Sequence, residues 1–201
     1  MTKKIILTWD FDGCIGQINA TYPYNFDSEA FLVETPMAKY ALEKMKEYGI
    51  KSCFAITGYS AEKGTAPFNF PELIAEIQDA GHEIASHNWK HEWIPLFKED
   101  QIDKSFARSK RALEGAIYNK QKVVGLVPPH NKPATWLRRG AYSLEDRGLW
   151  PWFKMGDLEN VFKVLKKNNY RWIRISHHPL INKIGLGKQI KTGRVYAYKG
   201  L

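Results

Sequence analysis

The chain has 201 residues, of which 44% are hydrophobic and 25% charged, so residues 1–201 are interpreted as one globular domain. It holds no apolar run of about 18 residues that could span a membrane, and the N-terminal "MTKKIILTWD" lacks the apolar stretch of a signal peptide, which predicts a cytoplasmic protein. The net charge of +9 favours an anionic partner, but the basic residues are scattered as on a solvated surface, without the basic-aromatic motifs of nucleic-acid binding.

Strands and helices are predicted to alternate along the chain. Runs rich in β-branched and aromatic residues predict strands at 3–12, 51–57, 82–87, 122–129, 149–155, 170–178 and 193–199. Helices are predicted at 36–49, 70–81, 98–117, 135–148 and 158–169. The first of these helices has Pro36 at its start and Gly49 after its end. The helix at 98–117 is amphipathic, with Ile102, Phe106, Ser109 and Leu113 on the face expected to be buried.

This alternation predicts an α/β fold with a parallel sheet of about seven strands. The sheet could be open and doubly wound, or it could form a distorted or incomplete (β/α) barrel, because a complete eightfold barrel needs about 250 residues. In both architectures the functional side chains gather at the carboxyl ends of the strands.

Carboxylates and imidazoles stand at these strand ends. Asp10 and Asp12 end the first strand, His87 ends the third, and His130 follows the fourth. The strand at 170–178 ends in His177 and His178. With His91, which follows His87 by four residues, five of the six histidines lie at or just after a strand end, and we expect them to converge on one rim of the sheet.

Asp10 and Asp12 belong to one face of the first strand, since side chains two residues apart point the same way, about 7 Å from each other. Ile6 and Thr8 are predicted to share that face, with Ile5, Leu7, Trp9 and Phe11 packing on the other. A single aspartate at a strand end is typical of a helix N-cap or a turn. Two on one face favour a functional site.

The segment "SHNWKHEW" places His87 and His91 four residues apart. One helical turn would bring their side chains within about 5–6 Å of each other, which suits two ligands of one metal ion. Cys14 and Cys53 are too isolated to form a zinc ribbon or a disulfide framework. Together with Asp12, the histidines predict a His/His/Asp site for zinc, or for cobalt or nickel. The alternative is a pair of structural histidines.

The segments "TWDFDG", "FAITG" and "AGHEIASHNWKH" together resemble the polysaccharide deacetylases with the NodB-homology domain, carbohydrate esterase family 4. The resemblance extends over residues 4–180 and is most specific in "GHEIASHNWKH". It implies a distorted seven-stranded (β/α) barrel that removes acetyl groups from N-acetylated sugars with the help of a metal ion.

The resemblance also implies residue roles. Asp12, His87 and His91 would bind the metal, and Asp10 would be the catalytic base. "IRISH" matches the closing motif of the family, with His177 as the general acid and His178 as a second choice that would point to the opposite face.

Three residues are candidates for contact with the carbohydrate substrate. Pro129 and His130 belong to "GLVPPHNKP", which corresponds to the third family motif, and Trp89 is a candidate sugar platform. Trp89 and the other tryptophans near strand ends are equally explained as core and rim packing.

The chain departs from the family at its third motif. Val127 stands where the family has an arginine directed at the catalytic aspartate, and His130 stands where it has an aromatic residue. Arg174, on the strand of the proposed acid, is a candidate replacement. Asp157 is the only match for the aspartate that supports this arginine, and it is equally explained as a helix N-cap.

Two other functions compete with deacetylation. "DFDG" resembles the nucleophile loop of a haloacid dehalogenase-type phosphatase, with Asp10 as nucleophile, Asp12 as general acid and Thr57 on the phosphate, but this interpretation leaves the histidines unused. The valine at 127 instead motivates a catalytically silent carbohydrate-binding protein on the same fold. Within the amidohydrolases, the substrate could also be a small amide in place of a polymer.

Overall fold

The computed structural model describes residues 6–20, 27–131 and 158–174. The strands predicted at 149–155 and 193–199 and the helix predicted at 135–148 lie outside these residues. The same holds for Asp157, His177 and His178.

Strands and helices alternate as predicted, except that an additional helix, α1, stands between the first strand and the first predicted helix. The strands are β1 (Thr8–Phe11), β2 (Cys53–Ile56), β3 (Glu83–Ser86), β4 (Gly125–Leu126) and β5 (Trp172–Ile173). The α-helices are α1 (Gly13–Asn19), α2 (Ser28–Glu47), α3 (Pro71–Asp79), α4 (Glu99–Ala116) and α5 (Leu158–Lys167). Short 3₁₀ turns η1 (Gly58–Ala61), η2 (Ile94–Leu96) and η3 (Pro129–Asn131) follow three of the strands or their loops.

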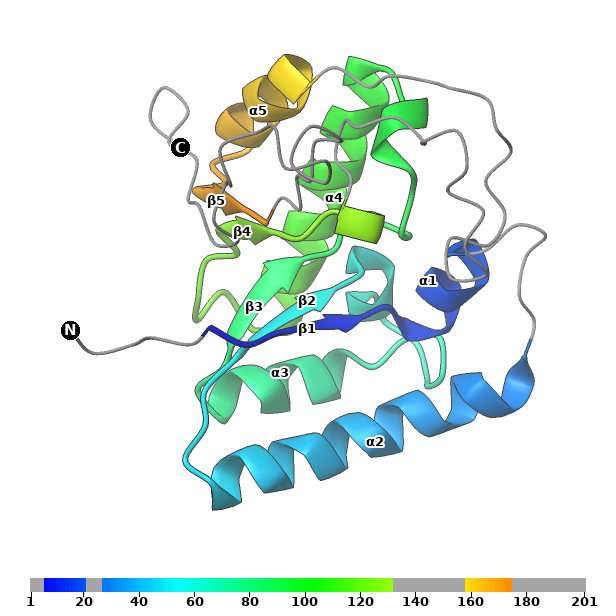
Figure 1. The fold of residues 1–201 in the computed structure, drawn as a ribbon, viewed down its shortest axis with the longest axis vertical. Helices are drawn as coiled ribbons and strands as arrows, with labels where there is room; N and C mark the ends of the chain where they lie inside the picture. The colour runs from blue at the N-terminus through cyan, green and yellow to red at the C-terminus, as the bar shows by residue number, and fades with distance from the viewer. Residues whose placement is uncertain (1–5, 21–26, 132–157, 175–201) are drawn as a thin grey trace, which may run out of the picture.

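The five strands form one parallel sheet in the order β1-β2-β3-β4-β5, so consecutive strands are neighbours (Figure 1). This confirms the parallel α/β architecture and five of the seven predicted strands. The carboxyl ends of all five lie at one edge, as the sequence requires for a shared site. Within the described ranges, no helix has both the length and the apolar character needed to cross a membrane.

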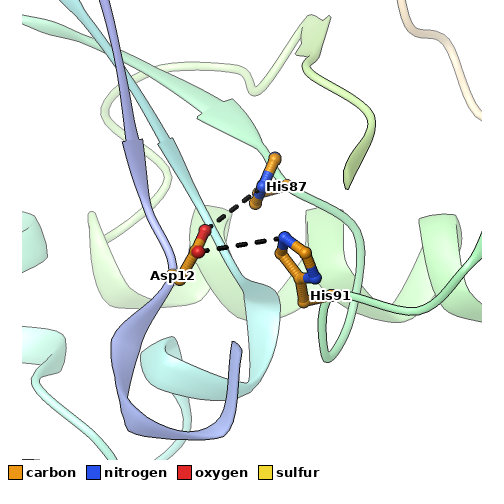
Figure 2. A group of neighbouring side chains, drawn as sticks. All are labelled: Asp12, His87 and His91. Carbon is orange, nitrogen blue, oxygen red and sulfur yellow. Dashed lines mark ion pairs between the residues drawn. The ribbon is translucent and has the colours of Figure 1, made fainter. Parts of the chain in front are cut away.

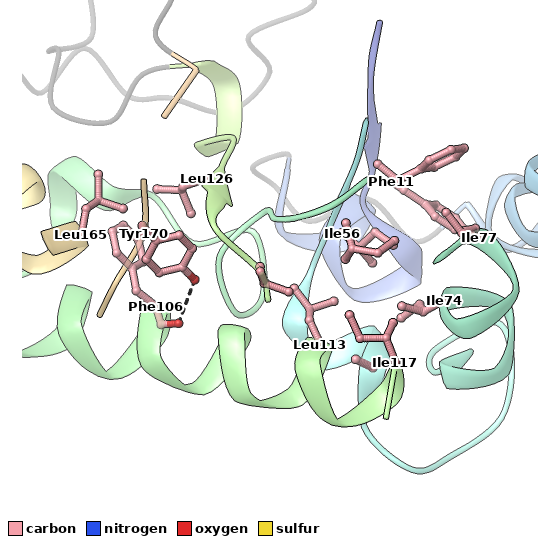
Figure 3. Close-up of a cluster of buried hydrophobic side chains, with 14 of the residues drawn as sticks. Phe11, Ile56, Ile74, Ile77, Phe106, Leu113, Ile117, Leu126, Leu165 and Tyr170 are labelled. Carbon is pink, nitrogen blue, oxygen red and sulfur yellow. Dashed lines mark hydrogen bonds between the residues drawn. The ribbon is translucent and has the colours of Figure 1, made fainter. Parts of the chain in front are cut away.

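The main hydrophobic core lies between the sheet and the helices α3, α4 and α5 (Figure 3). Ile56 of β2 and Leu126 of β4 belong to it, and Phe106 and Leu113 of α4 are fully buried. Tyr170, before β5, donates a hydrogen bond of 3.0 Å from its hydroxyl to the carbonyl of Phe106. All four residues predicted on the buried face of α4, namely Ile102, Phe106, Ser109 and Leu113, are buried.

A second buried cluster consists of small residues with one indole beside them. Cys53, Ala55, Ala85 and Val127 form it, and Trp172 packs against them. Register places Asp10, Ala55 and Ala85 side by side on three neighbouring strands. Side chains paired in this way in a parallel sheet point to the same face, so Asp10 lies on the face that carries the small residues.

The sheet is curled around this face. β1 and β5 are its two edges, and in a flat sheet four strand spacings would separate them by about 19 Å. Arg174, directly after β5, nevertheless contacts Asp10 of β1, with Nη2 2.7 Å from Oδ1. The described part is therefore a curled five-stranded parallel sheet, and the seven-stranded barrel stays a prediction.

Helix α2 begins earlier than the sequence predicted. Asp27 accepts hydrogen bonds from the backbone N–H groups of Glu29 and Ala30, which makes it the N-cap and adds two turns before Pro36. Pro36 lies inside the helix, where the prediction at 36–49 took it as the first residue. The capping aspartate was the stronger start signal.

The packing predicted for the first strand is only partly correct. Phe11 is buried and stacks on Phe70, with ring centroids 4.6 Å apart. Trp9 remains 44% exposed and Leu7 is exposed as well, because β1 is an edge strand of the described sheet.

We expect Gly125→Ala to destabilise the fold. A Cβ at this position would overlap the indole ring of Trp172, which donates a hydrogen bond of 3.0 Å to Glu83 and cannot simply move away. Overpacking of this kind costs about 1–3 kcal/mol, measurable as the free energy of unfolding in urea. Gly115→Ala is the control, since nothing lies within 4 Å of its Cβ in α4 and the helix should gain up to about 1 kcal/mol. Equal stability of the two variants would contradict this packing.

Candidate metal centre

Asp12 stands between β1 and α1 with its side chain turned toward the sheet edge. It occupies the N-cap position of α1, but its carboxylate makes no capping hydrogen bond. The backbone is held by other groups: the Thr57 hydroxyl donates to the carbonyl of Asp12 at 2.7 Å, and Glu34 accepts from the N–H of Gly13 at 3.2 Å. Gly13 has φ +65°, and a Cβ there would overlap Ser60. The cap interpretation of Asp12 is thus wrong, and its carboxylate is available to a ligand.

The loop after β3 carries both histidines in a folded-back turn. The sequence predicted one helical turn, but Asn88 and His91 adopt left-handed backbone conformations, with φ 53° and 61°. The carboxylate of Glu92 holds this turn, accepting from the N–H groups of Trp89 at 3.1 Å and Lys90 at 2.8 Å. The two imidazoles still meet, with ring centroids 4.9 Å apart.

Asp12, His87 and His91 converge as predicted (Figure 2). Nε2 of His87 lies 3.2 Å from Oδ1 of Asp12, and Nε2 of His91 lies 3.8 Å from Oδ2. One potential ligand atom from each residue lies within 4.8 Å of the others. Both histidines are buried, and Asp12 is partly buried.

The tautomer of His87 is determined by its backbone contact. Nδ1 of His87 lies 2.6 Å from the carbonyl oxygen of Val127, which can only accept, so Nδ1 carries the proton. The lone pair is then on Nε2, the atom that faces Asp12. A backbone carbonyl commonly orients a metal-binding histidine in this way.

Burial and mutual charge set the protonation of the three groups. Burial lowers the pKa of His91 to about 4, so this imidazole is neutral at pH 7. Burial acts to raise the pKa of Asp12, but His91 and His87 outweigh it and hold that pKa well below its usual range. For His87, burial acts to lower the pKa, yet Asp12 raises it above its usual value. The cluster thus places an ionised Asp12 carboxylate beside a His91 imidazole that is neutral at pH 7.

A divalent cation fits this cluster. Oδ1 of Asp12 and Nδ1 of His91 are buried and have no hydrogen-bond partner among the described residues. An ionised carboxylate and two imidazoles, without thiolates, suit zinc, cobalt or nickel and leave coordination positions open for water and substrate.

Asp10 and Arg174 form an ion pair beside the cluster. Nη2 of Arg174 lies 2.7 Å from Oδ1 and 2.8 Å from Oδ2 of Asp10. Asp10 lies in β1, on the face that carries the small residues, and Asp12 follows the end of that strand with a helical backbone conformation. The two carboxylates thus have different partners: Asp10 pairs with the guanidinium of Arg174, whereas Asp12 groups with His87 and His91 among the described residues.

The predicted substrate contacts differ in their surroundings. His130, in the turn that Pro129 begins, has its ring centroid 4.9 Å from those of His91 and Trp93, so it borders the cluster. Trp89 is only 5% exposed, and the guanidinium of Arg108 lies 3.9 Å from the centre of its ring. Its environment is that of a packing residue, the alternative that the sequence left open.

Two residues that hold the site were not predicted. Glu92 stabilises the histidine loop, and Glu34 of α2 supports the backbone after Asp12. Neither follows a strand end, which was the signal used to find the other residues. The position of Glu92 next to His91 was the only available indication.

Comparison with known proteins identifies relatives of this chain. The family model described as polysaccharide deacetylase matches residues 3–145. A peptidoglycan-N-acetylglucosamine deacetylase of Bacillus cereus is 26% identical over 118 residues, which cover 55% of this chain and 37% of that protein.

Solved structures show the same fold. A polysaccharide deacetylase structure from Mycobacterium smegmatis, described as putative, matches with a TM-score of 0.59 and 21% identity, over 84% of this chain and 49% of that one. A family 4 carbohydrate esterase from Streptomyces lividans in complex with acetate matches with a TM-score of 0.50 and 18% identity, over 84% and 62%. The chain thus spans less than two thirds of the length of each of these proteins.

Proposed function

Because the chain belongs to the polysaccharide deacetylase family, we propose that it is a metal-dependent hydrolase that removes N-acetyl groups from an amino-sugar carbohydrate. The observation that carries the proposal is the convergence of Asp12, His87 and His91 beside a separate carboxylate, Asp10. One carboxylate and two imidazoles would hold the metal, and Asp10 remains for proton transfer.

The metal site and the base have separate tasks. When a divalent ion is held by the three ligands, its Lewis acidity polarises the amide carbonyl and lowers the pKa of water from about 15.7 toward 7. Asp10 would accept a proton from the water that attacks the acetyl carbonyl carbon, and such base catalysis typically contributes about 10²–10⁴-fold. Val127, through its carbonyl, keeps His87 in the tautomer that a metal requires.

The departing amine needs a proton, and we assign this task to His177, with His178 as the second choice. An imidazole is suited to it because its pKa lies near neutrality. Pro129 and His130, at the carboxyl end of β4, would contact the sugar, since His130 borders the metal cluster.

The relatives suggest the substrate class. One relative is a peptidoglycan N-acetylglucosamine deacetylase, and the net charge of +9 would favour an anionic glycan. We therefore propose N-acetylglucosamine within a glycan as the acylated sugar and zinc as the metal, with cobalt or nickel as substitutes.

The experiment that tests this function measures acetate release. The protein loaded with zinc is incubated with N-acetylglucosamine oligomers and with peptidoglycan, and acetate and free amine are quantified. We expect both products in equal amounts, loss of release with a chelator, and recovery when zinc is added back. No acetate with zinc, cobalt or nickel, or release of phosphate from a phosphomonoester with magnesium, would contradict the proposal and favour the phosphatase.

A further inference from the structure

We propose that Arg174 is a positioning residue that holds the carboxylate of Asp10 in the orientation needed for proton transfer. This inference rests on the proposed function, because it assigns a task to a partner of the base. One guanidinium nitrogen lies within 2.8 Å of both carboxylate oxygens. Charge-assisted hydrogen bonds of this kind are shorter and stronger than those between neutral groups.

The sheet register explains how Arg174 reaches Asp10. Leu126 of β4 pairs with Ile173 of β5, so Val127 and Arg174 occupy neighbouring positions one residue further along. The N–H of Arg174 also donates to the carbonyl of Leu126 at 2.9 Å. Val127 belongs to the small-residue cluster on the face that carries Asp10. An arginine side chain at position 127 or at position 174 would therefore leave the same face of the sheet at the same height along the strands, from two neighbouring strands.

The small residues leave room for this side chain. Ala55 on β2 and Ala85 on β3 lie between the two edge strands, and neither extends far from the sheet. Burial and Glu83 raise the pKa of the nearby Cys53 thiol to about 12, and the charges of Arg174 and Asp10 both act on it. Asp10 pairs with Ala55 of β2 in the sheet register, so the ion pair lies on the face that carries these small residues.

A catalytic base must be correctly oriented as well as ionised. A displacement of about 1 Å in a catalytic arrangement can cost about 100-fold in rate, and an exposed aspartate side chain rotates unless something holds it. Both side chains of this pair are partly exposed, at 29% for Arg174 and 38% for Asp10. The geometry thus gives Asp10 a guanidinium partner that contacts both of its carboxylate oxygens.

The alternative is a purely structural link between the two edges of the sheet. Removal of such a link would change the free energy of unfolding and leave kcat unchanged. Exposed pairs contribute about 0–1 kcal/mol, so the two roles are separable: alignment acts on kcat, and linkage acts on the free energy of unfolding.

The test compares four variants with the wild type. Arg174→Ala is expected to lower kcat about 100-fold with little change in KM or metal content, and Arg174→Lys should retain more activity than Arg174→Ala. Arg171→Ala is the matched control, since it removes the same charge from an exposed position just before β5. The double variant Val127→Arg with Arg174→Ala moves the guanidinium by one strand, and it should recover much of the lost kcat.

Two outcomes overturn the inference. One is an unchanged kcat in Arg174→Ala; the other is an equal loss in Arg171→Ala. The ¹³C carboxyl resonance of Asp10 gives a readout independent of activity, and it should move in Arg174→Ala but stay in place in Arg171→Ala. A wild type that releases no acetate contradicts the proposed function, whereas an unmoved Asp10 resonance contradicts the role of Arg174.

Discussion

His87→Ala and His91→Ala are each expected to abolish stable metal binding and, with it, acetate release. The two imidazoles and Asp12 offer three ligand atoms within 4.8 Å, and removal of one leaves a two-ligand site. Loss even of groups that only orient metal ligands costs 10–100-fold in metal affinity, so we expect a weakening of at least about 100-fold. Metal per chain after dialysis, measured by elemental analysis, reports the result.

His82→Asn is the matched control for these variants. His82 is also a buried histidine, directly before β3, and its Nδ1 accepts a hydrogen bond from the backbone N–H of Ser52 at 3.2 Å. It stands at the amino end of β3, whereas Asp12 follows the carboxyl end of β1, at the opposite edge of the sheet. Asparagine retains an acceptor there. Circular dichroism must show that all three variants remain folded. Metal content equal to the wild type in both alanine variants would refute the site.

Asp10→Asn is expected to lower kcat by about 10²–10⁴-fold while metal content stays at the wild-type level. The amide has the size of the carboxylate but cannot accept the proton of the attacking water. Asp12, the proposed carboxylate ligand, is unchanged in this variant, so we expect the metal site to stay intact. The measurement is acetate release under saturating substrate, together with metal analysis of the same preparation.

This variant also separates the enzyme from a silent carbohydrate-binding protein. An enzyme loses acetate release on the substitution, whereas a binding protein has none to lose and retains affinity for the glycan. Full activity in Asp10→Asn would show that another group is the base, and the assignment of Asp10 would then be wrong.

Much of the metal site followed from local patterns. In a parallel sheet the carboxyl ends of all strands meet at one edge, so Asp12, His87 and His91 could be grouped once their strands were recognised. Their convergence is confirmed, although the turn that presents the histidines is left-handed at two residues and is held by Glu92. Hydrophobic periodicity does not report such a turn, because the hydrogen bonds that hold it come from a side chain in the same loop.

Two further predictions failed because they used local sequence signals alone. The start of α2 was misplaced because proline is a frequent first residue of helices, whereas the N-cap is Asp27, nine residues before Pro36, which accepts hydrogen bonds from free N–H groups of the first turn. The exposure of Trp9 depends on which strands flank β1, which its own alternation cannot indicate.

The residue types and spacings of this sequence were sufficient to predict the parallel α/β class, the convergence of Asp12, His87 and His91, and Asp10 as a second carboxylate near the same edge of the sheet. Only the tertiary structure decided that Arg174 lies against Asp10, 164 residues away in the chain. The reason is physical: strand periodicity determines which face a side chain occupies, but the distance between two edge strands depends on how strongly the whole sheet curls.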